Sequence, residues 1–354
     1  MKLFSKKSKS SIGLDIGSSL IKVVEIDHSK GEPMLTNYGV IKLPPEAIVE
    51  GELMDQSLVV DGIRECVAKA GIEGKRVVTA VSGRAVIVKK VVMDKMNPDD
   101  AREAIFWEAE QHVPFDIDDV CLDFQVLKED VGANQMEILL VAAKKEMVNA
   151  HASIIREAGL IPVIVDVDSF AVQNAIEVTG DASDDHRVVG LVNIGSDVTN
   201  INIIQNRIPY FTRDLSVGSN VFVEAVQREL GVDFEEADAL LSGSRSFDDE
   251  QRAQEIISEA AGEISMGIER SVSFLKTAGD ADRIDQVILS GGGARIPGLR
   301  DILARKHDME FKIGNPIAAI ERVENVFENA GDDVERVGPL LTVAMGLALR
   351  REAE

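Results

Sequence analysis

Two short segments of this chain carry the same polar pattern, and both are suited to holding phosphate. SIGLDIGSSLIKVVEI (Ser11 to Ile26) and VGLVNIGSDVTNINII (Val189 to Ile204) each read as an apolar strand, a polar glycine turn and a second apolar strand. Gly17 and Gly195 let the backbone approach a ligand closely, and the amide and hydroxyl groups after them can face phosphate oxygens. Because the copies lie 178 positions apart, the sequence predicts two related halves facing one nucleotide.

Polar side chains two positions before each turn glycine suit a metal ion or its waters. These side chains are Asp15 in the first segment and Asn193 in the second. A single glycine hairpin would be an ordinary structural turn, so the hypothesis depends on the repetition.

A third glycine-rich segment follows an apolar strand near the end of the chain. In LSGGGARIPGL, the residues Gly291, Gly292 and Gly293 come directly after the predicted strand DQVILSG. Three residues without side chains leave a flat surface on which an aromatic ring can lie. Upstream, an amphipathic helix is predicted over 250–277, and Glu263 and Arg270 project from nearly the same face of it.

Composition limits the classes of protein to which the chain can belong. With 354 residues and 45% hydrophobic content, it exceeds the size at which one core stops growing, so two lobes are expected. A net charge of −23 argues against nucleic-acid binding. The two cysteines, Cys66 and Cys121, have no metal-ligand spacing and favour a reducing compartment. No apolar run is long enough to span a membrane, so we expect a cytoplasmic protein.

Between the two phosphate segments, residues 84–159 form a candidate inserted unit. It begins with the alternating strand 86–93, followed by a helix that Asn97 caps and that runs to about Val113. Two strands (121–128 and 136–143) and a helix (145–158) complete the unit. The expected apolar stripe of the first helix is Ile105, Phe106, Ala109 and Val113. Trp107, the only tryptophan, falls on the opposite side with Glu103 and Glu110.

The remaining elements belong to the second half. Helices are expected over 219–230, 235–241 and 250–277, and the chain closes with the apolar helix VGPLLTVAMGLALRR, whose small residues allow tight packing.

In this order, the motifs resemble the actin-like ATPase superfamily, and within it the PilM family of type IV pilus assembly. The stretches that carry the resemblance are GLDIGSSLIKVVE, FWEAEQHVPFDIDDVCLDFQVL, ILLVAAKKEMVNAH, IPVIVDVDSFAVQNA, VNIGSDVTNINIIQN and LSGGGARIPGL. The resemblance implies an α/β fold of two lobes, RNase H-like and duplicated, with an FtsA-type 1C subdomain. The implied boundaries are 1–83, 160–186 and 331–354 for subdomain 1A, 84–159 for 1C, 187–232 and 284–330 for 2A, and 233–283 for 2B.

The resemblance also assigns roles to residues around ATP and Mg²⁺. The first phosphate loop is Asp15, Gly17, Ser18 and Ser19, with Lys22 reaching a terminal phosphate or facing solvent; the second is Gly195, Ser196 and Asp197; the adenosine motif is Gly291, Gly292 and Gly293; and Glu263 and Arg270 hold the ribose and adenine. Asn193 stands where many superfamily members have aspartate. Since an amide neither accepts a proton nor supplies negative charge, we expect nucleotide binding with weak hydrolysis at most.

The function implied is assembly. Subdomains 1C and 1A would form a groove for the N-terminal cytoplasmic segment of the inner-membrane protein PilN, and a homo-oligomer or ring would link the alignment complex to motor components. Membrane association would occur only through partners. Exposed aromatic residues often anchor partners, so Trp107 is a candidate partner-binding residue, with packing inside 1C as the alternative. The competing functions are an FtsA-like cell-division or cytoskeletal ATPase and an actin-fold phosphotransferase.

Overall fold

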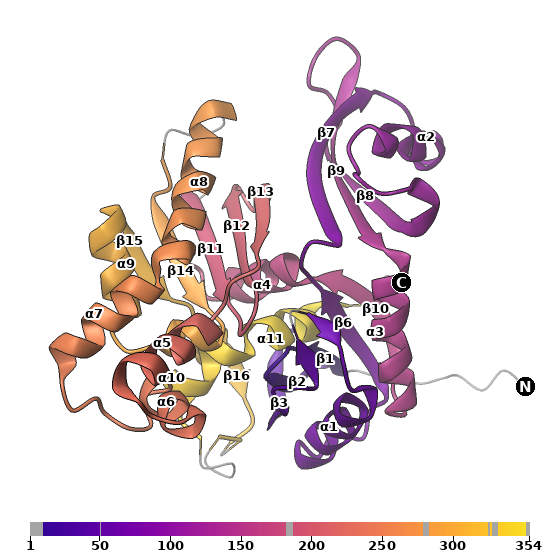
Figure 1. The fold of residues 1–354 in the computed structure, drawn as a ribbon. Helices are drawn as coiled ribbons and strands as arrows, with labels where there is room; N and C mark the ends of the chain where they lie inside the picture. Colours follow the sequence, from indigo (N-terminus) through magenta and orange to yellow (C-terminus); the bar gives the residue numbers. More distant parts are fainter. Residues whose placement is uncertain are drawn as a thin grey trace, which may run out of the picture.

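The structure, a computed structural model, describes residues 10–49, 51–181, 187–278, 283–324, 326–327 and 332–351. Two lobes lie side by side, and a smaller unit rises from the first lobe (Figure 1). In the described part of the chain, no helix is both long and apolar enough to cross a membrane.

The first lobe is built on a six-stranded sheet in the order β10-β6-β1-β2-β3-β16. Its strands are β1 (Ser10–Ile16), β2 (Leu20–Asp27), β3 (Met34–Lys42), β6 (Arg76–Val81), β10 (Ile161–Val167) and β16 (Glu321–Arg322), and a small hairpin of β4 (Ile48–Val49) and β5 (Glu52–Leu53) lies beside it. Strands β1, β2 and β3 are antiparallel, whereas β6 and β10 run parallel to β1. Helices α1 (Gln56–Lys69) and α3 (Lys145–Glu157) cover one face, where Ile63 and Ile155 pack on Leu14 and Val23.

The second lobe repeats this topology. Its sheet has the order β13-β12-β11-β14-β15, with strands β11 (Val188–Ile194), β12 (Thr199–Gln205), β13 (Ile208–Leu215), β14 (Gln286–Ser290) and β15 (Glu310–Ile313). Again three consecutive antiparallel strands are followed by two parallel ones. The covering helices are α5 (Asn220–Leu230), α6 (Phe234–Leu241), α7 (Glu250–Ala260), α8 (Gly262–Ala278) and α9 (Leu299–His307). The prediction of two related halves is therefore confirmed.

Two helices lie between the sheets and join the lobes (Figure 1): α4 (Asp168–Glu177) and α11 (Thr342–Leu349). One buried cluster contains Val78 of the first sheet, Leu191 and Ile288 of the second, and Val172 and Leu347 of the two helices. At Gly346 an added Cβ would lie 1.7 Å from the Ala171 carbonyl oxygen, so α11 touches α4 through backbone. The predicted close packing of the last helix is confirmed. Before it come α10 (Val334–Val337) and the 3₁₀ turns η3 (Pro316–Ala319) and η5 (Gly338–Leu341).

The smaller unit is a three-stranded antiparallel sheet, β7 (Val86–Asp94), β9 (Gln135–Lys144) and β8 (Val120–Lys128), covered by α2 (Pro98–Glu110). The 3₁₀ turn η1 (Ile117–Asp119) leads into β8. Ala101, Ile105, Ala109 and Val113 of the α2 region are buried on this sheet. Phe106, expected in the stripe, is instead 51% exposed, because the buried row follows i, i+4 spacing and leaves Phe106 beside it.

Two further details depart from the sequence-based expectations. Helix α3, expected to complete the inserted unit, packs through Ile154 and Ile155 on the first lobe. The helix predicted over 250–277 is interrupted between α7 and α8, where Gly262 follows Ala261. Glycine has low helix propensity, which explains why the break occurs there.

Candidate functional site

The two predicted phosphate turns have the same backbone geometry. Gly17 N–H donates to the Leu20 carbonyl at 3.0 Å, and Gly195 N–H donates to the Val198 carbonyl at 2.9 Å. Each turn joins two strands whose cores are buried in their own lobe. The predicted hairpins are thus present, and in both of them the turn glycine donates its amide to the carbonyl three residues later.

The duplication extends to the side chains at the base of each turn. Asp15 lies opposite Lys22 across the first hairpin, and Asn193 lies opposite Asn200 across the second. Lys22 Nζ donates to Asp15 Oδ2 at 2.7 Å, and Asn193 Nδ2 donates to Asn200 Oδ1 at 2.9 Å. One half therefore has an ion pair where the other has a neutral amide pair. Lys22 is directed at Asp15 rather than at solvent.

The glycine triplet lies against the end of the second hairpin. Strand β14 runs parallel to β11 and pairs Ser290 with Asn193, so the triplet begins where the hairpin turns. Gly291 has φ +82°, and a Cβ there would lie 2.5 Å from the Ile194 carbonyl oxygen. A Cβ on Gly293 would lie 2.2 Å from the Ile194 side chain. Both positions require glycine, and the turn η2 (Gly292–Arg295) continues from them.

The second loop is anchored by the start of α5. Ser219 N–H donates to the Gly195 carbonyl at 2.7 Å, and Asn220 Nδ2 donates to Asp197 Oδ1 at 2.6 Å. In contrast, the hydroxyl groups of Ser18, Ser19 and Ser196 hydrogen-bond to no other residue that the structure describes, which leaves them available to a ligand.

A carboxylate that sequence reasoning missed lies between the hairpins. Asp168 begins α4 directly after β10, and the hydroxyl of Ser82, which follows β6, hydrogen-bonds to it. Burial, together with the negative charges of Asp15 and Asp214, raises the pKa of Asp168 to about 7. The available signal was its place at the carboxyl end of a parallel strand, where ligands of open α/β sheets gather. We call Asp15, Lys22, Asp168, Asn193 and Asp214 the interlobe site.

Histidine 151 of α3 lies on the first-lobe side of this site. Its Nε2 is 2.7 Å from the Thr79 hydroxyl of β6. Burial lowers the pKa of His151 to about 4, although the charge of Asp15 acts in the opposite direction. A neutral imidazole is therefore expected at neutral pH. Nothing in the sequence around His151 indicated this position.

Arg295, also missed, lies just after the glycine triplet. Its Nε is buried and has no hydrogen-bond partner among the described residues. Burial, with nearby Arg336, lowers its pKa, while Asp238 acts in the opposite direction. A buried guanidinium with an unused donor is costly unless a ligand completes it.

These features fit a magnesium nucleotide. Free serine hydroxyls and turn amides suit phosphates, the glycine triplet presents backbone without side chains, and the Arg295 Nε–H has no hydrogen-bond partner among the described residues. In the described residues, no three His, Cys, Asp or Glu side chains gather as a metal site. Mg²⁺ usually binds through one or two carboxylates, waters and substrate phosphates. Asp15 would supply such a carboxylate.

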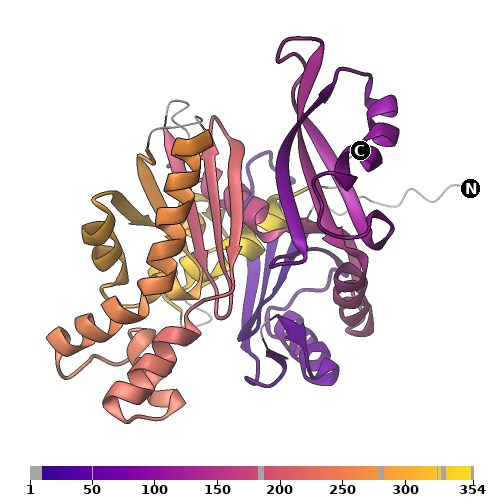
Figure 2. The same ribbon diagram turned by 45° about the horizontal axis from the view of Figure 1, so that its top comes forward.

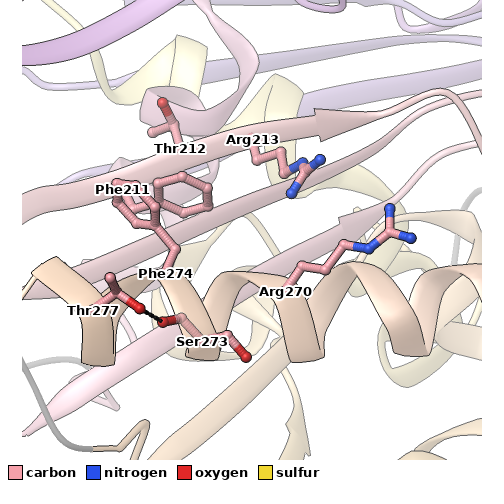
Figure 3. A pocket seen from close by; sticks show the side chains of 7 residues that line it. All are labelled: Phe211, Thr212, Arg213, Arg270, Ser273, Phe274 and Thr277. Carbon is pink, nitrogen blue, oxygen red and sulfur yellow. Dashed lines mark hydrogen bonds between the residues drawn. The ribbon is translucent and has the colours of Figure 1, made fainter.

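Neither of the two residues predicted to hold the ribose and adenine forms a hydrogen bond or ion pair with a described residue of the triplet. Arg270 lies exposed on α8 beside the edge strand β13 (Figure 3). Two strands, β12 and β11, separate β13 from β14, the strand that leads into the triplet. Glu263 lies exposed in the first turn of α8 and forms no hydrogen bond or ion pair with a described residue. Sequence spacing placed both on one helix face but could not say which surface that face meets.

Trp107 of α2 is 73% exposed, which agrees with its predicted position away from the apolar stripe. It borders a small hollow of about 160 Å³ whose other walls include Met93, Met96 and Gln111. An indole this exposed does not stabilise the core of its own unit, so packing beneath a neighbouring strand is not what the structure shows.

Comparison with known proteins identifies the family. The family described as type IV pilus assembly protein PilM matches residues 13–352. This chain belongs to the PilM family. In addition, a solved structure described as the PilM-PilN type IV pilus biogenesis complex has 29% sequence identity and a TM-score of 0.83, covering 96% of this chain and 97% of that one.

More distant structures share the fold. The ethanolamine utilization protein EutJ from Carboxydothermus hydrogenoformans is 17% identical with a TM-score of 0.56, covering 96% of this chain and 89% of that one. MreB5 of Spiroplasma citri, solved with bound AMPPNP, is 12% identical with a TM-score of 0.55, covering 96% and 95%. The two-lobed actin-like fold expected for the PilM family is thereby established for this chain.

Proposed function

We propose that this chain is a cytoplasmic MgATP-binding scaffold of type IV pilus assembly that binds the N-terminal cytoplasmic segment of PilN. The observation that carries the proposal is the match, along almost the whole of both chains, to the solved PilM-PilN complex. Membership of the PilM family supports the same role. The chain would be held at the inner membrane by its partner and would link the alignment complex to the motor.

The nucleotide part of the proposal uses both hairpins. The triphosphate would supply negative charge between the lobes, so that Ser18, Ser19, Ser196 and the turn amides from both lobes could bind one ligand. Asp15 would order the magnesium shell, and Lys22 would turn from Asp15 toward phosphate. With Asn193 neutral and hydrogen-bonded to Asn200, the second hairpin has no carboxylate at the position equivalent to Asp15, so hydrolysis would be slow.

The partner part of the proposal uses the unit at 84–159, taken as subdomain 1C within the boundaries predicted above. The PilN segment would lie in a groove between 1C and subdomain 1A, with Trp107 at or beside that surface. Its exposure and the absence of a core role support a contact of this kind.

Calorimetric titration with a synthetic peptide of the PilN cytoplasmic N-terminus tests the proposal. We expect saturable one-to-one binding to the full chain, measured with and without MgATP. A scrambled peptide of the same composition is the control. No heat above the scrambled control under either condition would refute the partner assignment, whereas absence of MgATP binding would refute only the nucleotide assignment.

A further inference from the structure

A shallow groove of about 480 Å³ lies between α8 and the edge strand β13 on the second lobe (Figure 3). Two matched rows of side chains form it. The rings of Phe211 and Phe274 are 4.7 Å apart, and farther along Leu215 packs on Gly267, where a Cβ would lie 2.2 Å from the Leu215 side chain.

Between these two contacts, Arg213 of β13 faces Arg270 of α8 (Figure 3). Both side chains are exposed, and neither forms an ion pair or hydrogen bond in the part of the chain that the structure describes. The whole chain has a net charge of −23, with 61 acidic residues against 38 basic ones. Two adjacent arginines without a carboxylate partner are therefore a local positive site on a negative molecule.

An aromatic surface adjoins the arginine pair. Phe274 is 49% exposed although its ring packs at a tilt against that of Phe211. Arginine and aromatic side chains are the residue types enriched in protein interfaces and in their hot spots. Two guanidinium groups beside one exposed ring suit a ligand that carries carboxylates next to an apolar side chain, because carboxylates bind the arginine fork in two-point hydrogen bonds.

We propose that this groove binds an acidic peptide segment of a second partner protein, with its carboxylates on Arg213 and Arg270 and an aromatic or aliphatic side chain on Phe274. The inference rests on the proposed function in one respect: a scaffold that joins two partners needs a second surface. Helix α8 and β13, which form the groove, belong to the second lobe, whereas the unit that carries Trp107 rises from the first (Figure 2).

Fluorescence anisotropy with the labelled peptide EEFEEL tests the groove, and KKFKKL serves as the charge-reversed peptide. We expect EEFEEL to bind the full chain, with affinity falling by about tenfold or more in the double variant Arg213→Glu, Arg270→Glu, and also falling in Phe274→Ala. The matched control is Lys276→Glu, an exposed position on α8 that does not line the groove. It should leave binding within about twofold.

Equal binding of EEFEEL to parent and double variant, or no preference over KKFKKL, would overturn the proposal. Unchanged melting temperatures show that the variants are folded. The double variant should still bind the PilN peptide, because that peptide is proposed to bind the other surface. Loss of PilN-peptide binding by the parent would contradict the proposed function and not the groove.

An independent observation concerns a row of hydrogen bonds across the second sheet. Ser290 Oγ donates to Asn193 Oδ1 at 3.3 Å, Asn193 Nδ2 to Asn200 Oδ1 at 2.9 Å, and Asn200 Nδ2 to Asp214 Oδ1 at 2.8 Å. Asp214 Oδ2 then accepts from Gly83 N–H at 2.5 Å. The row begins beside the glycine triplet and ends on the first lobe at Gly83, in the short connection between β6 and β7.

Because Asp214 accepts from Asn200, each of the two amides in the row has one usable orientation, whereas the Ser290 hydroxyl can rotate to suit them. Ser290, Asn193 and Asn200 are buried, so an unmet donor or acceptor there is costly. Asn193 must accept from Ser290 and donate to Asn200, which a carboxylate cannot do. The asparagine that departs from the superfamily pattern is thus required by its neighbours. Gly83 has φ +94° and lies between β6 and the unit at 84–159.

The geometry points to Asn193, Asn200 and Asp214 as positioning residues that couple the nucleotide end of β11 to the orientation of the 84–159 unit. The coupling rests on the proposed function, because it relates MgATP to PilN-peptide binding. A ligand that shifts β11 would change the Asp214–Gly83 contact, and the coupling free energy would appear equally in both affinities.

The test measures PilN-peptide affinity with and without MgATP in the parent, Asn193→Asp, Asp214→Ala and the control Ser216→Ala. Ser216 Oγ accepts from Arg84 at the same junction but lies outside the row. We expect the ratio of the two affinities to move toward one in the first two variants and to stay at the parental value in the control. Amide hydrogen exchange at Gly83 should respond to MgATP in the parent only.

A parental ratio retained by Asp214→Ala would overturn the coupling, and so would a ratio of one in the parent. If the parent binds neither ligand, the proposed function itself fails, and Gly83 exchange in Asp214→Ala still shows whether the row holds the junction.

Discussion

At the scale of single residues, Asp15 is the group on which the nucleotide assignment can be tested most directly. Its carboxylate is 11% exposed and paired with Lys22. Asp15→Ala removes the only charged oxygen ligand assigned to magnesium, so MgATP affinity should fall by on the order of 1–3 kcal/mol. Calorimetric titration measures this.

Lys22→Ala is the companion variant, because it loses the same ion pair and retains the carboxylate. If Asp15→Ala bound MgATP as tightly as the parent, magnesium would not depend on this carboxylate.

His151 gives a pH dependence whose sign can be worked out. The pKa of His151 is about 4 in the folded chain and 6.5 in the unfolded chain. Between these two pH values, the unfolded chain therefore carries a proton on His151 that the folded chain does not. The contribution of His151 to stability is therefore complete above pH 6.5 and is lost as the pH falls toward 4. We expect His151→Gln to show a flatter melting temperature between pH 6.5 and 4 than the parent.

Circular dichroism melting curves across this range provide the measurement. His112→Gln, at a half-buried histidine of the unit at 84–159, serves as the comparison that shows whether the flattening is specific to His151. Parallel curves for His151→Gln and the parent would mean that His151 is not held neutral by burial.

At the scale of elements, α2 presents one face to its own sheet and leaves Trp107 outside. Trp107→Ala should leave the melting temperature within about 1 °C, because an exposed surface substitution usually changes stability by less than 0.5 kcal/mol. Affinity for the PilN peptide should fall by about tenfold or more, as for an aromatic hot spot.

Phe106→Ala changes a neighbouring exposed ring on the same helix and is the control for general loss of apolar surface. A drop of several degrees in the melting temperature of Trp107→Ala would instead assign this indole to the fold. An unchanged affinity would remove it from the partner surface.

At the scale of the whole molecule, a ligand held by both hairpins must stabilise the arrangement of the two lobes. Some direct polar contacts across them are exposed, such as Lys42 Nζ to Asp238 Oδ2 at 2.6 Å, and pairs of this kind contribute about 0–1 kcal/mol. MgATP at 100 times its dissociation constant should add about 2.7 kcal/mol, which raises the melting temperature by several degrees.

Thermal unfolding with MgATP, with ATP plus EDTA, and with Mg²⁺ alone separates the contributions. We expect the full increase only with MgATP. An equal increase with ATP plus EDTA would show that binding does not need the metal, and no increase in any sample would argue against a nucleotide between the lobes.

The sequence by itself determined the repeated hairpins, the glycine triplet and most element boundaries. These depend on local chemistry: a turn that needs glycine, an apolar strand on either side and a capped helix are all encoded within about ten neighbouring residues. The cap at Asn97 is an example, since its side chain accepts from the amides of Asp99 and Asp100 as the local pattern required. The family resemblance rests on the same local segments.

Only the tertiary structure decided which of these residues meet. Asp168, Asp214 and Arg295 come from segments whose local pattern is ordinary, and they became site residues because strand order brings their ends together. Arg270, predicted at the nucleotide, instead lines the groove between α8 and β13. Periodicity predicts which helix face carries a residue, but not which element packs against that face. Asn193 shows both limits: its residue type was visible in the sequence, but the partners that require an amide lie 7 and 97 positions away.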